Sequence, residues 1–181
     1  MELSTNRSVA RIVLIVVLCL FTVIGINRSL KKVASDIEAG FYNGVKNADG
    51  YTEKSIQSHL DNVADASNGL ASVLADSDTE KAFQSSRYAL LDAKTYHEKY
   101  EALTEITDAV EKLLLSSKIQ YTEGTEEAFA YYTNTILQAK RAVESLSYNE
   151  TVSEYYEKTL KTFPISILRL AVLTDGPQYF N

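Results

Sequence analysis

The sequence has few residues that interrupt or cross-link a chain: of its 181 residues, none is tryptophan, one is cysteine, two are proline and seven are glycine. A lone cysteine cannot form an intramolecular disulfide. Both prolines lie within the last eighteen residues, so long stretches carry nothing that would stop a helix. Hydrophobic residues nevertheless make up 45% of the chain, which excludes disorder along its whole length.

Positive charge is scarce after the first part of the chain. Before Val33 there are five basic residues and one acidic residue, whereas from Val33 onward 13 basic residues stand against 23 acidic ones. Binding to nucleic acid needs concentrated positive charge, because phosphates must be neutralised. The charge distribution therefore argues against a nucleic-acid partner, and an acidic helical surface mainly serves solubility.

One long apolar run lies near the N-terminus, at Val9–Ile26, and reads VARIVLIVVLCLFTVIGI. A helix of roughly 20 such residues spans the hydrocarbon layer of a membrane. Arg11 and Arg28, at the two ends of the run, can extend their charged groups to the two interfaces. The run therefore predicts a transmembrane helix.

Two kinds of cleavable signal compete with this interpretation. A secretory signal would show small residues around a cleavage site after the run, but Ile24–Ile26 reads Ile-Gly-Ile. A lipoprotein signal would place small residues directly before the cysteine, but Val17 and Leu18 precede Cys19. We therefore expect an uncleaved anchor in contact with lipid at residues 9–27, between a tail at 1–8 and a helical domain at 28–181. Basic residues flank the run almost equally, which leaves the orientation open.

Beyond the anchor, apolar residues recur every three to four positions, which is the spacing of one helix face. Ile37, Phe41 and Val45 begin such a stripe, and it resumes over Ile56–Leu74. This pattern predicts one long helix that leaves the membrane, with a bend near Asn47–Gly50.

Helix starts and loops can be placed in the rest of the chain. Asp76 precedes a helical stretch and can accept hydrogen bonds from free backbone N–H groups. Residues 79–118 fit either one helix or two helices broken near Thr95–His97. Gly124 marks the clearest loop, and Thr125 then opens a helix with two glutamates in its first turn, where the helix dipole favours acids.

The last helical stretch carries the best apolar stripe, from Phe129 to Phe163, and Pro164 ends or kinks it. Long amphipathic helices with few linkers pack together through their apolar faces. Neither strand-like alternation nor a Gly-rich phosphate loop occurs in the sequence. The predicted fold is all-α, an antiparallel four-helix bundle that follows an N-terminal single transmembrane helix.

The residues needed for catalysis or metal binding do not occur at the required spacings. A di-iron bundle uses Glu-x-x-His motifs, but Ile56 and Lys94 stand three residues before His59 and His97. No Gly-x-Ser-x-Gly nucleophile motif occurs, and Cys19 lies inside the apolar run. We therefore predict no catalytic residue, no cofactor and no metal site, and a protein that is not an enzyme.

Tyrosine is abundant, with twelve residues, and several lie on the last helical stretch. Tyr131, Tyr148 and Tyr155 are candidates for an interaction surface, because aromatic residues are enriched at protein interfaces. The alternative, which we favour, is a tyrosine-rich core whose hydroxyl groups reach the surface.

A pattern near the C-terminus has a tyrosine, an aliphatic residue, Phe-Pro and, after 14 residues, Tyr-Phe: Tyr156, Leu160, Phe163, Pro164, Tyr179 and Phe180. An earlier helix carries the spacing Ile-x-x-x-Leu…Asp…Leu at Ile56, Leu60, Asp65 and Leu70. Both patterns resemble the LemA family of bacterial single-span proteins. Three departures occur. The family's basic pair is replaced at Asn62 and Val63, its proline falls near Asn68, and its Tyr-Asn pair, at Tyr148 and Asn149, lies one residue too far from Tyr156.

The resemblance implies a four-helix antiparallel bundle on an anchor in the bacterial cytoplasmic membrane, and it implies neither an enzyme activity nor a cofactor. It assigns no functional residues. Our leading hypothesis is a membrane-anchored scaffold or interaction protein that binds protein partners or self-associates. The alternative is a four-helix ligand-sensing domain that works with a separate signalling partner.

Overall fold

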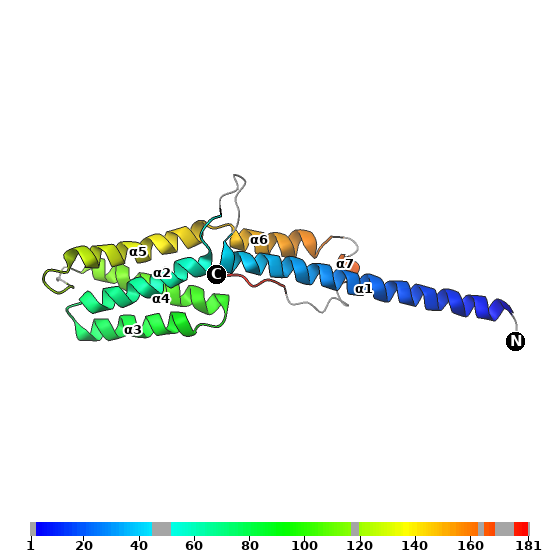
Figure 1. Cartoon of the computed structure of the whole chain (residues 1–181), viewed down its shortest axis with the longest axis horizontal. Coiled ribbons are helices and arrows are strands. Elements are labelled where there is room, and N and C mark those ends of the chain that lie inside the picture. The colour runs from blue at the N-terminus through cyan, green and yellow to red at the C-terminus, as the bar shows by residue number, and fades with distance from the viewer. Residues whose placement is uncertain (1–2, 45–51, 117–119, 163–164, 169–175, 181) are drawn as a thin grey trace. The chain divides into compact units, whose positions relative to one another are not determined.

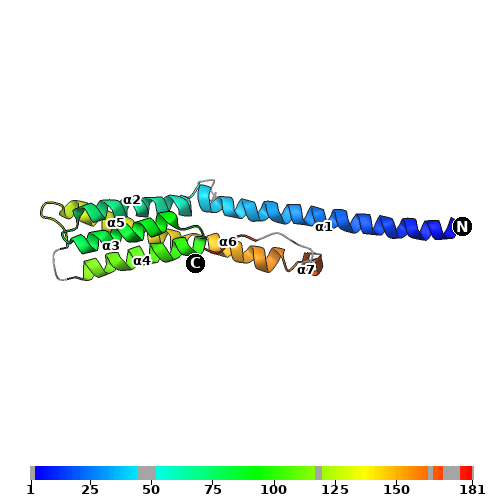
Figure 2. The same cartoon turned by 90° about the horizontal axis from the view of Figure 1, so that it is seen from below.

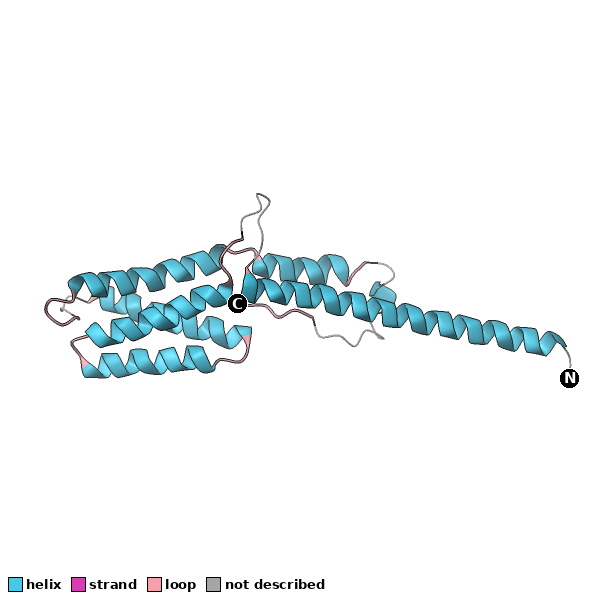
Figure 3. Ribbon diagram, in the orientation of Figure 1, coloured by secondary structure: helices cyan, strands magenta, loops and turns pink. Residues whose placement is uncertain are grey.

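The computed structural model describes residues 3–44, 52–116, 120–162, 165–168 and 176–180. Within these residues, helices are joined by loops and no strand occurs (Figures 1 and 3). The α-helices are α1 (Leu3–Asn43), α2 (Ile56–Val73), α3 (Ser77–Asp92), α4 (Tyr96–Leu115), α5 (Glu126–Ser145), α6 (Tyr148–Glu154) and α7 (Ile165–Leu168). One turn of π-helix, η1 (Tyr155–Thr159), follows α6. The all-helical prediction is thus confirmed for the described residues.

Helix α1 is the one helix within the described part of the chain that is long and apolar enough to cross a membrane. The apolar part of this helix is not buried within the protein, and Phe21, for example, is 69% exposed. An N-terminal signal sequence can also be long and apolar enough to meet this criterion. The helix begins at Leu3, so the predicted tail is already helical from that residue.

The prediction of one helix from residue 37 to residue 74 is wrong. Helix α1 ends at Asn43, and Gly44 follows with a φ of +76°, a conformation that favours glycine. Helix α2 begins only at Ile56, after Ser55, whose side chain caps it. The apolar stripe is interrupted after Val45 and resumes at Ile56. The predicted bend near Asn47–Gly50 lies outside the described residues.

The chain divides into two compact units. The first consists of Met1–Glu38 with Thr151–Pro177, and the second consists of Ala39–Glu150 with Gln178–Asn181. Each unit therefore combines an early segment of the chain with a late one.

In the second unit, α2 contacts α3 and α5, and α4 also contacts α3 and α5. The two views agree that these four helices lie side by side (Figures 1 and 2). Apolar side chains from each of them form the core: Leu60, Val63, Leu70, Phe83, Leu103, Ile106, Val110 and Ile136. The stripes predicted from the sequence therefore supply the buried faces.

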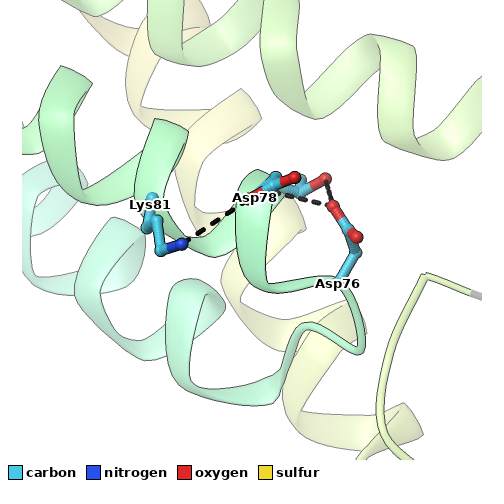
Figure 4. A network of polar contacts seen from close by, with 4 residues as sticks. Asp76, Asp78 and Lys81 are labelled. Atoms are coloured by element: carbon cyan, nitrogen blue, oxygen red, sulfur yellow. Dashed lines mark hydrogen bonds and ion pairs between the residues drawn. The ribbon is translucent and has the colours of Figure 1, made fainter.

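The start of α3 is capped as the sequence predicted. The carboxylate of Asp76 accepts hydrogen bonds from the backbone N–H of Thr79 at 2.8 Å and from its hydroxyl at 2.6 Å (Figure 4). In the same turn, Lys81 lies 3.6 Å from the carboxylate of Asp78. The hydrogen bonds from Thr79 hold the pKa of Asp76 below its ordinary value.

A second cap divides residues 79–118 into two helices. The hydroxyl of Thr95 accepts a hydrogen bond from the N–H of Glu98 at 3.2 Å, and the carboxylate of Glu98 accepts one from the N–H of Thr95 at 2.9 Å. This reciprocal capping box starts α4. The N–H of Lys94 also donates to Glu98, so the pKa of Glu98 is lowered chiefly by backbone hydrogen bonds.

The last helical stretch is interrupted where the sequence predicted continuity. Helix α5 ends at Ser145, Leu146 is extended with a ψ of 139°, and α6 begins at Tyr148. In η1 the N–H of Leu160 donates to the carbonyl of Tyr155 at 3.1 Å, which is the spacing of a π-helix. Pro164, which was expected to end this stretch, lies outside the described residues.

The first unit has a small apolar cluster of its own. Leu30 and Ala34 of α1 are buried together with Tyr155 of η1. Partly buried hydrophobic residues pack around them: Ile26, Ile37, Tyr156, Leu160 and Ile165. The segment of α1 after the apolar run is thus held by residues more than 100 positions later.

Candidate functional site

Phe41, in the last turn of α1, is the centre of an aromatic cluster in the second unit. Its ring stacks on that of Tyr96 with 4.0 Å between centroids and 4° between planes. The rings of Tyr148 and Phe180 lie 5.7 Å and 5.5 Å away, in edge-on and tilted arrangements. Phe41, Tyr96, Tyr148 and Phe180 are all buried, and we call these four residues the aromatic cluster.

A charged side chain lies beside the aromatic cluster. The ammonium group of Lys99 is 5.3 Å from the ring centroid of Phe41 and 5.6 Å from that of Tyr42. Each such contact stabilises a structure by about 0.5–1 kcal/mol at a partly exposed site. The same ammonium group donates to the side-chain carbonyl of Gln57 at 2.7 Å, which ties α4 to α2.

The C-terminal residues are fixed by two hydrogen bonds in this unit. The hydroxyl of Tyr148 donates to the carbonyl of Gln178 at 3.0 Å. The backbone N–H of Phe180 donates to the side-chain oxygen of Asn149 at 2.9 Å. Phe180 also meets the ring of Tyr100 at 5.3 Å between centroids. The chain end is therefore part of the folded core.

In the first unit, Tyr156 fixes a residue near the C-terminus by a hydrogen bond. Its hydroxyl donates to the carbonyl of Pro177 at 3.1 Å. A Cβ atom at Gly176 would lie 2.4 Å from this hydroxyl oxygen, so only glycine fits against the tyrosine. The close approach of Tyr156 therefore accounts for the glycine at position 176.

Most residues of the C-terminal signature have structural positions. Tyr156 and Leu160 pack on the cluster around Leu30, and Phe180 is buried while Tyr179 is 42% exposed. Phe163 and Pro164 lie outside the described residues. Of the signature residues that the structure describes, Tyr156, Leu160 and Phe180 thus contribute to packing. The sequence analysis missed the part played by Asn149, although it had noted the Tyr-Asn pair.

The three tyrosines proposed as an interaction surface lie in different environments. Tyr148 and Tyr155 are buried, and only Tyr131 is exposed, at 65%. Burial raises the pKa of Tyr155, with a smaller contribution from Tyr156. The three residues therefore do not form an exposed row: Tyr148 and Tyr155 are buried, as in the tyrosine-rich core that we favoured, and Tyr131 is at the surface.

Two exposed leucines of the second unit lie where α4 ends. Leu115 is 86% exposed and Leu114 is 50% exposed. Together with Leu137 of α5 they line a groove of about 470 Å³. Charged side chains of both signs complete its wall: Glu111, Lys140, Arg141 and Glu144.

Neither histidine joins a cluster that could hold a metal ion. Within the described ranges, no three His, Cys, Asp or Glu residues come together. His97 pairs with Glu101 at 3.4 Å on the surface of α4. His59 is partly buried, and its pKa is lowered first by burial and then by the charge of Lys54.

Comparisons with models of protein families, with curated proteins and with solved structures give no match for this chain. The assignment of a function therefore rests on the chemistry of its own residues.

Proposed function

We propose that the protein is a membrane-anchored, non-enzymatic scaffold or interaction protein of the bacterial cytoplasmic membrane. Helix α1 is the anchor, and the second unit binds a partner protein or a second copy through its helical surface. The observation that carries this proposal is the groove between α4 and α5, whose wall includes the exposed Leu114 and Leu115. Exposed leucines beside a groove are typical of a protein contact.

The anchor is supported by the exposure of apolar side chains along the first part of α1. Ile12 and Phe21 are examples on opposite sides of the apolar run. A helix that is apolar on every face is unfavourable in water, whereas lipid covers all of its faces. Three basic residues follow within two turns, at Arg28, Lys31 and Lys32, where a membrane interface would lie.

Helices α2 to α5 fit an antiparallel four-helix bundle. Short connections join successive helices, for example Leu74–Asp76 between α2 and α3, and Ala93–Thr95 between α3 and α4. Short connections favour opposite directions in neighbouring helices. Helix α2 also contacts α5, so the four helices form a closed ring.

The proposed relationship to the LemA family, as a divergent member, is supported by the roles of its signature positions. Tyr156 and Phe180 both make specific contacts that fix the C-terminal residues. The replacement of the family's basic pair at Asn62 and Val63 marks the divergence.

Substitution in the groove tests the interaction proposal. Leu114→Glu and Leu115→Glu place charge on the proposed contact, so the assembly formed by full-length protein in mild detergent should dissociate. Leu91→Glu is the matched control, because Leu91 is an equally exposed leucine on α3 and does not line the groove. If all three variants keep the assembly of the wild-type protein, the groove is not the contact surface.

A second candidate function is ligand sensing together with a separate signalling partner. It is favoured by a polar pocket between α2 and α5 that includes His59 and Tyr131.

A further inference from the structure

A second pocket, of about 400 Å³, lies between the start of α2 and the middle of α5. Six of its lining residues are polar: Lys54, His59, Asn62, Tyr131, Thr135 and Gln138. We call it the His59 pocket. We propose that it binds a small anion, free in solution, that carries a phosphate or a carboxylate group. This proposal does not depend on the scaffold function, which uses the groove between α4 and α5.

The charge of the His59 pocket is unusual for this chain. None of its lining residues is acidic, although acidic residues outnumber basic ones by 23 to 13 from Val33 onward. Of the acids nearest in sequence, Asp61 accepts a hydrogen bond from Gln57, and Glu53 lines a neighbouring cavity that Lys54 also borders. None of the ion pairs among the described residues includes Lys54. Within the lining of the His59 pocket, an anion would therefore meet the charge of Lys54 without a carboxylate.

The remaining groups suit an oxyanion. Asn62 and Gln138 can donate amide N–H groups from α2 and α5, and the hydroxyl of Tyr131 is a further donor. The hydroxyl of Thr135 is used within α5, where it donates to the carbonyl of Tyr131 at 2.8 Å. The pocket also lies at the N-terminal end of α2, where the helix dipole favours negative charge.

The ionisation of His59 provides the readout. Burial and the charge of Lys54 keep its pKa below the ordinary value, so the ring is neutral at pH 7 without a ligand. The titratable groups that line the pocket are Lys54 and His59 from the α2 side and Tyr131 from α5. A bound anion offsets the charge of Lys54 and stabilises the protonated ring, so binding raises the pKa of His59.

The test is a titration of the full-length protein in neutral detergent with inorganic phosphate, at constant ionic strength, followed by the NMR signals of the histidine rings. The chain has two histidines, so His97 is an internal control. We expect phosphate to raise the pKa of His59 in a saturable manner and to leave that of His97 unchanged. No saturable change, or equal changes at both histidines, would overturn the proposal.

Two variants make the result specific. Lys54→Ala removes the exposed cation of the pocket and should weaken phosphate binding by about tenfold or more. Lys112→Ala, on α4 and outside the pocket, should bind phosphate like the wild-type protein. Equal binding by both variants would contradict the proposed site.

The source of the anion is tested separately. In the absence of phosphate, part of the neutral detergent is replaced by phosphatidylglycerol, which presents the same chemical group on a lipid. A response of His59 to inorganic phosphate supports a free anion. A response to the lipid alone would assign the pocket to a headgroup and overturn the proposal as stated.

Discussion

At the residue scale, single contacts set strict limits on which side chain each position accepts. Gly69 of α2 lies against the ring of Tyr132 of α5, and a Cβ atom at Gly69 would stand 2.4 Å from that ring. Helices α2 and α5 therefore approach closely at this point. The sequence pattern, such as the apolar stripe that contains Leu70, gives no indication of this contact, because Gly69 and Tyr132 are 63 positions apart in the chain.

Replacement of this glycine gives the first prediction. In an open helix, Gly→Ala stabilises by up to about 1 kcal/mol, but Gly69→Ala should destabilise the second unit by about 1–3 kcal/mol, because the ring of Tyr132 must move. Chemical denaturation of the full-length protein measures the change. Asp65→Ala, at an exposed position one turn earlier, is the control. A stabilised Gly69→Ala variant would contradict the close packing.

The second prediction concerns His59 and pH. Its pKa is lower in the folded state than in the unfolded state, so the unfolded chain binds a proton first as the pH falls. The stabilisation is complete above the unfolded pKa of about 6.5 and is lost as the pH falls through the folded pKa. The melting temperature in phosphate-free buffer should therefore decrease between about pH 7 and pH 5, and His59→Gln should reduce this decrease. His97→Gln should leave this decrease unchanged. If His59→Gln shows the same dependence of melting temperature on pH as the wild-type protein, the account is refuted.

At the element scale, helix starts were predictable and some helix ends were not. Asp76 and Thr125 mark starts with local chemistry, an oxygen cap in one case and first-turn acids in the other. The break at Leu146 has no proline or glycine to announce it. The apolar stripe continues on both sides of the break, and only tertiary packing distinguishes two helices from one.

Helix α4 depends on its capping box, which gives the third prediction. Thr95→Ala removes the acceptor for the N–H of Glu98 and should destabilise the second unit by about 1 kcal/mol. Thr95→Ser keeps a hydroxyl oxygen at the same place and should lose much less. Thermal unfolding of the two variants separates the cap from a general effect of substitution, and equal losses would argue against the cap.

At the scale of the whole molecule, residues from distant parts of the chain complete each unit. Phe41, Tyr148 and Phe180 meet in the aromatic cluster although more than 100 positions separate the first from the others. Composition and periodicity predicted that tyrosines would be partly buried, but they could not show which rings meet. The resemblance to a family pointed to Phe180, and only the structure shows its partners.

The fourth prediction separates two adjacent residues of the C-terminal segment. Phe180 is 2% exposed and Tyr179 is 42% exposed. Phe180→Ala should destabilise the second unit by about 3–5 kcal/mol, the usual cost of emptying a buried aromatic site. Tyr179→Ala should cost far less, as measured by denaturation of the full-length protein. Similar small losses for both would mean that the chain end is not part of the core.

The central claim is that an uncleaved apolar helix anchors a helical protein that acts through protein contacts. Native mass spectrometry of the full-length protein, released from the membrane in mild detergent, tests both parts together. The account predicts chains that retain the apolar N-terminal residues and that occur in an assembly of more than one polypeptide. A mass that lacks these residues, or a single unaccompanied chain, would contradict it.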